Sequence, residues 1–464
     1  MNILLTHGYF IEDDIKEQVI MKPYPPLGIL YISSYLEQNG FDNKIFDSTF
    51  FNFELLTEEL KKFKPDVIGI YTNLMTKLNV LKLIRYIKQN TFLSHTKIIL
   101  GGPEVSNHAN NFLIYGADVI VIGEGEVTML ELVTAFNNQT SISTINGIAY
   151  LDQNNKMIKT NERDKIRSMD DLPFPNRKKI NLQLYFDAWK KKHGLNTISI
   201  STMRGCPYTC KWCSRAVYGQ SYRRRSASLV ADEMEWIENN YTVDTAWFVD
   251  DVFTISHKWL QEFADQVTAR KIKLKYECIT RADRLNEHTI RLLKQSGCFR
   301  VWIGAESGSQ RVIDLMDRRV KVQQVRDMIQ LARHEGLEAG TFIMVGYPGE
   351  SEEDIKETLH HLKQSNPDYY TITTAYPIKG TPLYESVESS FTTSFLWDQN
   401  TDRDIDFKRT YSRKYYDYAI RWIYNEVALH KLTLTQNETR FKIPLLKAKS
   451  LAARSLMWFE KSFR

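Results

Sequence analysis

Three of the five cysteines in this 464-residue chain fall within eight residues. Cys206, Cys210 and Cys213 have the spacing CxxxCxxC. Thiolates are soft ligands that favour iron–sulfur clusters or zinc. A structural zinc site takes four protein ligands, but Cys278 and Cys298 are distant in sequence and lack CxxC spacing. The loop therefore indicates a cubane cluster in which one iron stays open to a substrate or cofactor, as catalytic metal sites keep one position free.

The overall composition supports a metal site in a globular protein rather than a disulfide framework. The cysteines are odd in number and sparse, which argues against structural disulfides. Lys and Arg number 61 against 56 Asp and Glu, an excess too small to indicate nucleic acid. No apolar run approaches the roughly 18 residues of a membrane span. We expect a cytoplasmic protein that binds no nucleic acid.

Two regions alternate short strands with helices and are expected to form parallel sheets. In residues 1–135, strands are expected at 2–7, 42–47, 67–71, 97–100 and 118–122. Five such strands suit a doubly wound, flavodoxin-like order, which binds ligands at the carboxyl ends of the strands. In residues 191–385, strands are expected at 197–202, 246–250, 273–280, 300–305, 338–345 and 370–375. Six strand–helix units predict a partial β/α barrel, whose active site lies on the loops after the strands.

The remaining two regions do not repeat this rhythm. Residues 136–190 combine a polar run, a hairpin-like patch at 147–158 and the proline-containing stretch at 169–176, and we interpret them as a linker. Residues 386–464 are rich in Tyr, Arg and Trp and are expected to form a helical substrate or lid region. The chain is therefore an α/β protein with four predicted parts: a doubly wound domain, a linker, a barrel and a helical end.

The cysteine loop follows the first barrel strand, and in this position it resembles the radical S-adenosylmethionine (radical SAM) superfamily. The doubly wound domain ahead of it resembles the cobalamin-binding subgroup, which includes methyltransferases and the anaerobic Mg-protoporphyrin ester cyclase. The resemblance implies three cofactors, which are a [4Fe–4S] cluster on the three cysteines, SAM at the open iron, and cobalamin. It also implies reductive cleavage of SAM to a 5′-deoxyadenosyl radical under anaerobic conditions.

The resemblance further implies which residues bind SAM. They are Trp212, Asp250, Asp251, Arg281, Glu306, Ser307 and Gly346. Trp212 would pack near the adenine, Asp250 would hold the amine, Arg281 the carboxylate, and Glu306 the ribose hydroxyls. Structural alternatives stay open, because a tryptophan also suits a core and an aspartate also suits a helix N-cap.

The cobalamin site is implied at the strand ends of the doubly wound domain. Its expected residues are Pro26, Gly28, Thr72, Asn73, Leu74, Gly101, Gly102, Glu104, Gly123 and Glu124. None of the ten histidines has Asp two residues before it, which excludes a lower cobalt ligand from an Asp-x-His-x-x-Gly motif. The lower face of the corrin would then lie over the loop that begins at Thr72.

Two basic segments have a functional and a structural interpretation each. Residues 223–225 are three consecutive arginines, which suit an anionic group or a solvated surface patch. Residues 441–464 are amphipathic and contain six Lys or Arg and one Glu. Such a helix lies on an anionic membrane surface or packs its apolar face on its own domain.

These features predict a cobalamin-dependent radical SAM enzyme that methylates an unactivated carbon. One alternative is an oxidative cyclase or ring-rearranging enzyme that transfers no methyl group. Another is a cobalamin sensor or carrier with an inactive barrel. The expected partners are a small molecule, such as a lipid, a pigment or a natural-product intermediate, and a reductant such as flavodoxin or ferredoxin.

Overall fold

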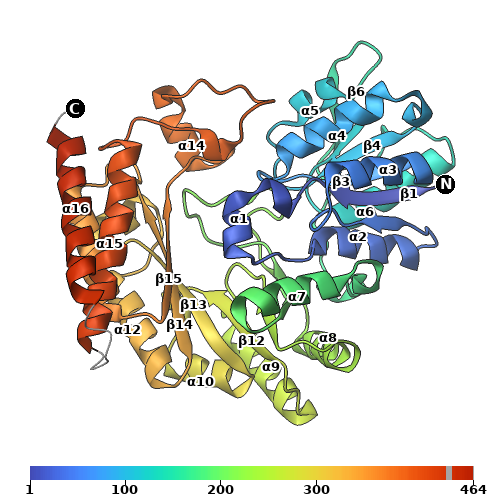
Figure 1. Ribbon diagram of the computed structural model, residues 1–464. Helices are drawn as coiled ribbons and strands as arrows, with labels where there is room; N and C mark the ends of the chain where they lie inside the picture. The colour runs from blue at the N-terminus through green and yellow to red at the C-terminus, as the bar shows by residue number, and fades with distance from the viewer. Residues whose placement is uncertain (435–441, 463–464) are drawn as a thin grey trace. The chain divides into compact units, whose positions relative to one another are not determined.

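The computed structural model describes residues 1–434 and 442–462 (Figure 1). It divides into two compact units. The first unit comprises Met1–Pro207, Ser214–Trp247 and Leu396–Thr401, and the second comprises Tyr208–Cys213, Phe248–Phe395 and Asp402–Arg464. The domain boundaries expected from the sequence at residues 135, 190 and 385 stay predictions.

The first unit contains a seven-stranded sheet in the order β2-β1-β3-β4-β5-β6-β7. Its strands are β1 (Ile3–His7), β2 (Lys44–Phe46), β3 (Val67–Tyr71), β4 (Lys97–Gly101), β5 (Val119–Val121), β6 (Ile148–Leu151) and β7 (Met157–Lys159). The first five pair in parallel, which confirms the flavodoxin-like order. The hairpin-like patch forms β6 and β7, which add to the edge of this sheet as antiparallel strands.

Helices cover both faces of this sheet because its strands are apolar on both sides. The helices of the unit are α1 (Ile15–Ile20), α2 (Leu27–Gln38), α3 (Phe53–Phe63), α4 (Lys77–Gln89), α5 (Ala109–Tyr115), α6 (Gly125–Asn137), α7 (Leu182–His193) and α8 (Ala227–Asn240). Consecutive residues of one strand enter different core clusters. Ile98 packs with residues of α4 and α5, whereas Ile99 packs with residues of α2 and α6.

A second sheet has six strands in the order β15-β14-β13-β12-β11-β8. They are β8 (Thr197–Ile200), β11 (Thr245–Phe248), β12 (Lys275–Thr280), β13 (Cys298–Glu306), β14 (Glu338–Val345) and β15 (Tyr369–Thr374). Strands β12 to β15 pair in parallel. The helices between and after them include α9 (His257–Arg270), α10 (Glu287–Gln295), α11 (Gln310–Leu315), α12 (Val322–His334), α13 (Glu352–Ser365) and α14 (Pro382–Val387). This alternation confirms the partial barrel.

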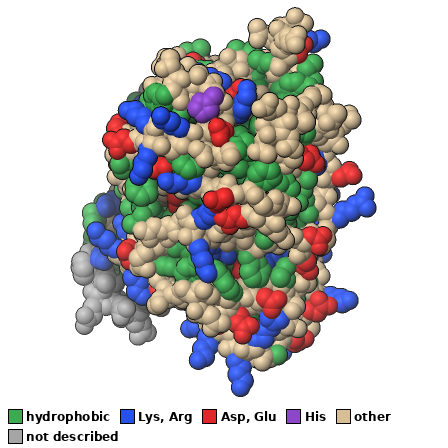
Figure 2. Space-filling view, turned by 90° about the vertical axis from the view of Figure 1, so that its right-hand side faces the viewer, with side chains coloured by type: hydrophobic (Ala, Val, Ile, Leu, Met, Phe, Trp, Pro, Cys, Tyr) green, Lys and Arg blue, Asp and Glu red, His purple; other side chains and the backbone are tan. Residues whose placement is uncertain are grey.

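Two long helices complete the second unit, as the sequence predicts for the C-terminal region. They are α15 (Arg413–Leu434) and α16 (Ile443–Ser462), and they pack side by side (Figure 1). Among the described residues, no helix is both long and apolar enough to cross a membrane. Basic and acidic side chains are interspersed on the face shown in Figure 2, consistent with the small net charge.

Strands β3 and β4 end in a tight crossing of two loops. The Thr72 amide donates to the Gly101 carbonyl over 2.7 Å, which continues the ladder by one bond. The next residue, Gly102, has φ +112°, and a Cβ atom built on it would lie 2.4 Å from the Thr72 carbonyl oxygen. A contact this short would force the backbone at Thr72 to shift, which costs free energy. Glycine at position 102 is thus required by the crossing itself.

We predict that Gly102→Ala lowers the free energy of unfolding by at least about 2 kcal/mol, because it combines a left-handed conformation with overpacking. The matched control is Gly28→Ala near the start of α2, where a Cβ atom meets nothing within 4 Å. That change should raise stability by up to about 1 kcal/mol, since alanine favours a helix. Urea unfolding of both variants measures the difference. Equal stabilities would contradict the proposed clash.

Candidate functional site

The cysteine loop begins beyond β8 and is closed at its base by a short antiparallel pair. The strands of this pair are β9 (Met203–Arg204) and β10 (Arg223–Arg224). Cys206 belongs to the first compact unit, whereas Cys210 and Cys213 belong to the second. Across residues 1–434 and 442–462, no group of three or more His, Cys, Asp or Glu side chains is gathered in a geometry that could hold a metal ion.

Cys210 lies beside two buried guanidinium groups of the second unit. Arg318 Nη1 is 3.6 Å from its sulfur and Arg281 Nη1 is 3.8 Å away. Cys210 itself is buried. A cluster bound by thiolates carries negative charge, and positive charge in a buried setting compensates it strongly. The surroundings of Cys210 therefore fit the predicted cluster.

Arg318 is held at this position from several sides. Its Nη2 donates to the Gly304 carbonyl over 3.2 Å and lies 3.7 Å from a Glu306 carboxylate oxygen. Its guanidinium carbon lies 5.9 Å from the centre of the Trp212 ring. Burial lowers the pKa of Arg318, but Glu306 and the Cys210 sulfur outweigh this effect and raise that pKa. The group stays charged beside the sulfur.

Arg281 is fixed with equal precision. Its Nε donates to Asp283 over 2.8 Å, and its Nη2 donates to the Arg318 carbonyl over 2.7 Å. Its guanidinium carbon lies 3.7 Å from the centre of the Tyr208 ring. Arg281 is the residue expected to bind the SAM carboxylate. In this structure the one terminal nitrogen not directed at Asp283 or Arg318 faces Cys210.

The other predicted SAM residues divide into two groups. Glu306 and Trp212 both lie near Arg318. Glu306 has φ +67°, and burial raises the pKa of its carboxyl although Arg318 and Arg281 lower it. Ser307 is fully buried, and its hydroxyl contacts Thr358 of α13 over 3.2 Å. At Ser307, these contacts support a structural role in the core.

Trp212 also packs with an apolar cluster of the second unit that includes Met316 and Tyr347. The loop around it is anchored there, because the Lys211 amide donates to the Met316 carbonyl over 3.1 Å and the Leu383 amide donates to the Lys211 carbonyl over 2.9 Å. Trp212 thus has core contacts next to the cysteines.

The two aspartates predicted to lie near SAM differ in exposure. At the end of β11, Asp250 is buried and Asp251 is exposed.

Gly346 lies at the end of β14 in a turn that a buried carboxyl stabilises. The Gly346 amide donates to Glu350 over 2.5 Å, and the Arg409 Nε donates to the Gly346 carbonyl over 3.2 Å. The other carboxyl oxygen of Glu350 has no hydrogen-bond partner within the described part of the chain. Burial raises the pKa of Glu350 to about 8, although the Gly346 amide lowers it.

The glycines predicted to bind cobalamin differ in the space around them. Gly123 has φ +92°, and a Cβ atom built there would find only the Val217 carbonyl oxygen at 3.9 Å. The space beside Gly28 is open, and Pro26 precedes it as the N-cap of α2. Gly101 is nearly as open, with the Val121 side chain at 3.8 Å. These three glycines leave room for a ligand to approach the backbone, which fits the predicted cofactor.

The loop after β3 is built around Asn73. Its side-chain oxygen accepts from the amides of Met75 and Thr76 over 2.9 and 3.0 Å, which forms an Asx turn. Thr72 is fully buried, and Leu74 is half-buried. The loop that is expected beneath the corrin is therefore ordered by its own side chains.

The two glutamates predicted to contact cobalamin are engaged within the first unit. Glu104 lies 3.8 Å from both Lys77 Nζ and His108 Nε2. Glu124 accepts from Arg204 over 2.8 Å and from Arg223 over 2.6 Å. These contacts favour a structural role for both carboxylates.

The arginine run at residues 223–225 is also paired with the chain itself. Arg223 binds Glu124, and Arg225 binds the fully buried Glu233, which Arg177 also contacts. Arg224 donates to the Thr202 hydroxyl over 2.8 Å. Neither the solvated surface patch nor a free anion site describes Arg225, which is buried.

Sequence patterns do not reveal the contribution of Arg318. It is separated from Cys210 by 108 residues, and the run Asp317-Arg318-Arg319 matches no metal-site spacing. The one usable signal is the position of Arg318, which follows the short helix α11 after β13, the strand that carries Glu306. That position identifies the residue only once the structure is known.

The chain thus combines a cysteine loop on a partial barrel with a doubly wound sheet that precedes it in sequence. Comparison with known families identifies both parts. Residues 200–362 match the radical SAM superfamily, and residues 19–133 match the B12 binding domain. The chain is a radical SAM enzyme with a B12 binding domain, and its cofactors are a [4Fe–4S] cluster, SAM and cobalamin.

Relatives and solved structures agree with this assignment. The chain is 28% identical over 403 residues to an uncharacterized methyltransferase of Pyrococcus horikoshii, with 85% of each chain covered. It is 26% identical over 387 residues to the anaerobic magnesium-protoporphyrin IX monomethyl ester cyclase of Rubrivivax gelatinosus, covering 79% of this chain and 66% of the cyclase. The fold resembles that of the cobalamin-dependent S-adenosylmethionine radical enzyme OxsB with aqua-cobalamin bound. The TM-score is 0.75 at 17% identity, covering 98% of this chain and 72% of that one.

We predict that Arg318→Met lowers the reduction potential of the reconstituted cluster, because the reduced cluster carries more negative charge. Loss of about 1.4 kcal/mol of charge compensation corresponds to about 60 mV for a one-electron couple. Potentiometric titration followed by electron paramagnetic resonance measures the shift. Arg319→Met is the matched control, because Arg319 is exposed and pairs with Asp317. An unchanged potential in Arg318→Met would show that Arg318 does not act on the cluster.

Glu350 should make stability depend on pH. Its pKa is raised from 4.5 to about 8 in the folded chain, so folding favours the protonated carboxyl. The corresponding stability is present below about pH 4.5 and is lost as the pH rises through about 8. Glu350→Gln stays neutral, so its free energy of unfolding relative to wild type should increase with pH, by on the order of 5 kcal/mol across this window.

Unfolding midpoints of both proteins from pH 5 to pH 9 measure this difference. Glu353→Gln, three residues later in the first turn of α13, is the control, because that side chain is exposed. A difference between Glu350→Gln and wild type that is constant with pH would contradict the raised pKa.

Proposed function

We propose that this enzyme methylates an unactivated carbon atom of a small-molecule substrate. The observation that carries the proposal is the order of two domains in one chain, with a B12 binding domain ahead of a radical SAM domain. The name of the Pyrococcus relative, which matches over 85% of both chains, supports methyl transfer.

When bound, the cluster supplies the electron that cleaves SAM, and cobalamin supplies a carrier for the methyl group. In the proposed site, Cys206, Cys210 and Cys213 hold the cluster through their thiolates. Arg281 and Arg318 compensate negative charge at the Cys210 sulfur. Their burial keeps this charge in a setting where water screens it little.

The remaining proposed contacts follow from the geometry at the strand ends. Trp212 offers an aromatic surface next to Arg318, and Glu306 offers a half-buried carboxyl whose oxygens can accept hydrogen bonds from a ligand. In the first unit, the open backbone at Gly28 and Gly123 suits a bulky cofactor. These residues bind and orient, while the reactive groups belong to the cofactors.

Oxidative cyclisation is the second candidate, and the resemblance to the cyclase of Rubrivivax gelatinosus favours it. The chain spans about two thirds of the length of that relative. We also propose a lipid, a pigment or a natural-product intermediate as substrate, and flavodoxin or ferredoxin as reductant in the cytoplasm.

Product analysis separates the two candidates. The reconstituted full chain is incubated anaerobically with cobalamin, a strong reductant, SAM bearing a deuterated methyl group, and the small-molecule fraction of cells that express it. Methylation predicts a product that gains one deuterated methyl group. Formation of 5′-deoxyadenosine with an unlabelled product that has lost hydrogen or gained oxygen would favour the cyclase and contradict our proposal.

We predict that Cys206→Ala, Cys210→Ala and Cys213→Ala each reduce 5′-deoxyadenosine formation by more than about a hundredfold. This exceeds the ~10–100-fold cost of removing a group that only orients a ligand. Iron content should fall with activity. Cys278→Ala is the matched control, because Cys278 is fully buried in β12 and lies outside the motif. Full activity in any one of the three motif variants would refute the ligand assignment.

A further inference from the structure

The C-terminal helix α16 has one buried face and one exposed face. Ser450, Ala453 and Met457 are its buried residues. The Ser450 hydroxyl donates to Glu426 of α15 over 2.6 Å, and Glu460 accepts from Ser412 over 2.7 Å. These residues recur at helical spacing and define the inner face. The sequence left open whether this helix packs its apolar face on its own domain. In the structure only the narrow inner face packs in this way.

The opposite face of α16 is apolar and exposed. At 100° per residue, it comprises Pro444, Leu445, Ala448, Leu451, Ala452, Ser455, Leu456, Trp458 and Phe459. We call these nine residues the outer face. None is charged, and all are exposed. Among its large hydrophobic side chains, the exposed fractions are 67% for Leu451, 64% for Trp458 and 56% for Leu445. Contiguous apolar surface of this kind marks an interaction site.

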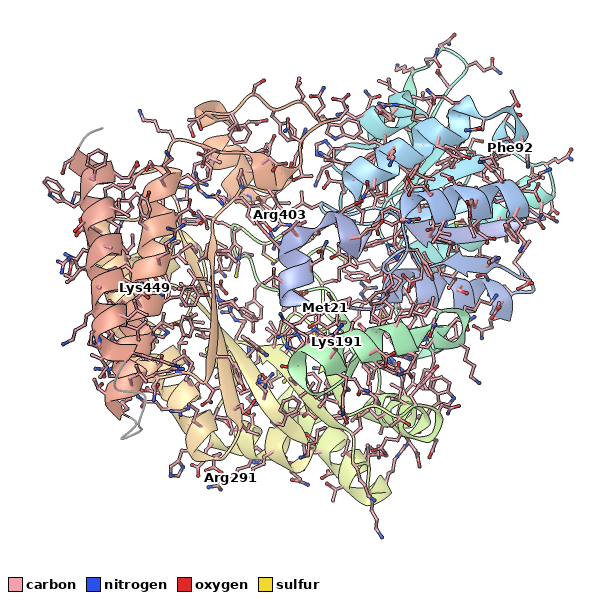
Figure 3. All side chains as sticks on the ribbon, in the orientation of Figure 1. Met21, Phe92, Lys191, Arg291, Arg403 and Lys449 are labelled. Carbon is pink, nitrogen blue, oxygen red and sulfur yellow. The ribbon has the colours of Figure 1, made fainter. Side chains whose placement is uncertain are left out.

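Basic residues border the outer face on both sides. Lys447 and Arg454 lie along one edge, and Lys449, labelled in Figure 3, lies along the other. The one acidic residue of the described helix, Glu460, is directed to Ser412 of the inner side. Lys461 pairs with Glu352 and also belongs to the inner side.

We propose that the outer face of α16 docks on an anionic lipid bilayer. An apolar face between two basic edges lets the helix lie in the interface, with its apolar side chains among the acyl chains and its Lys and Arg at the headgroups. A tryptophan on such a face suits the same depth. The helix does not have the apolar length to span the membrane, so the proposed mode is lateral.

The charge pattern disfavours the alternative occupants. A second copy of the chain would bring equal basic edges together along the helix, and like charges repel. An acidic protein would complement the edges but would leave the apolar centre without a defined partner. A bilayer with anionic headgroups supplies both parts at once.

Flotation of the full reconstituted chain with lipid vesicles tests the proposal. Vesicles of phosphatidylcholine alone are compared with vesicles that also contain phosphatidylglycerol. We expect binding to the anionic vesicles, strongly weakened at about 0.5 M salt because charges are then screened. The readout is binding, so it is independent of turnover and of the proposed methylation.

Two variants and a control separate the apolar and the basic contributions. Leu451→Ser with Phe459→Ser should lower partitioning at least tenfold. Replacing Lys447, Lys449 and Arg454 by Gln should lower it about a hundredfold, at roughly fivefold per basic residue. Ile114→Ser is the matched control, because Ile114 of α5 is 69% exposed, and it should bind like wild type.

Three results would overturn the proposal. They are equal partitioning to neutral and anionic vesicles, unchanged binding in both groups of variants, and a dimer that the Leu451 and Phe459 changes dissociate without any vesicle binding. Because all replaced side chains are exposed, circular dichroism and the thermal midpoint should stay those of wild type.

Discussion

Positive charge buried beside a cysteine sulfur is the interaction on which this account depends. Two guanidinium groups, from Arg281 and Arg318, lie within 4 Å of Cys210 Sγ. Burying charged groups is costly unless each has partners. The structure supplies these through Asp283 and Glu306 and through the carbonyls of Gly304 and Arg318. Two buried guanidinium groups with this many partners are expected at a site that must stabilise negative charge.

This constraint also explains the local backbone. Glu306 adopts φ +67° at a point where the pairing of β13 and β14 shifts register. Backbone strain of this kind persists where the surroundings determine it, and it is common at functional sites. The shift aims the Glu306 carboxyl at Arg318. Fold and site are therefore coupled at the strand end, as expected of a barrel whose chemistry lies on the loops after its strands.

Periodic features of the chain could be predicted from its sequence. The alternation of strands and helices is a local pattern that the sequence displays directly. It therefore predicted the flavodoxin-like order of β1 to β5 and the presence of six barrel strands. The CxxxCxxC spacing likewise predicted an iron–sulfur cluster from the sequence alone. Contacts between distant residues could not be predicted in this way. Arg318 meets Cys210 across 108 residues.

Side-chain direction was equally beyond the reach of sequence patterns. Ser307 follows a predicted ribose residue but contacts α13, and Glu124 follows a strand but binds two arginines. The alternation of a strand or loop does not specify which way such a group points when it has several potential partners. The same holds for α16, whose periodicity shows an amphipathic helix but not which stripe is buried.

The central claim is that three thiolates hold a cluster with one iron open to SAM. Electron paramagnetic resonance of the reduced, reconstituted chain with and without SAM tests it most directly. The account predicts iron in the protein and a spectrum that changes when SAM is added. Zinc in place of iron, or a cluster spectrum that SAM leaves unaltered, would contradict it.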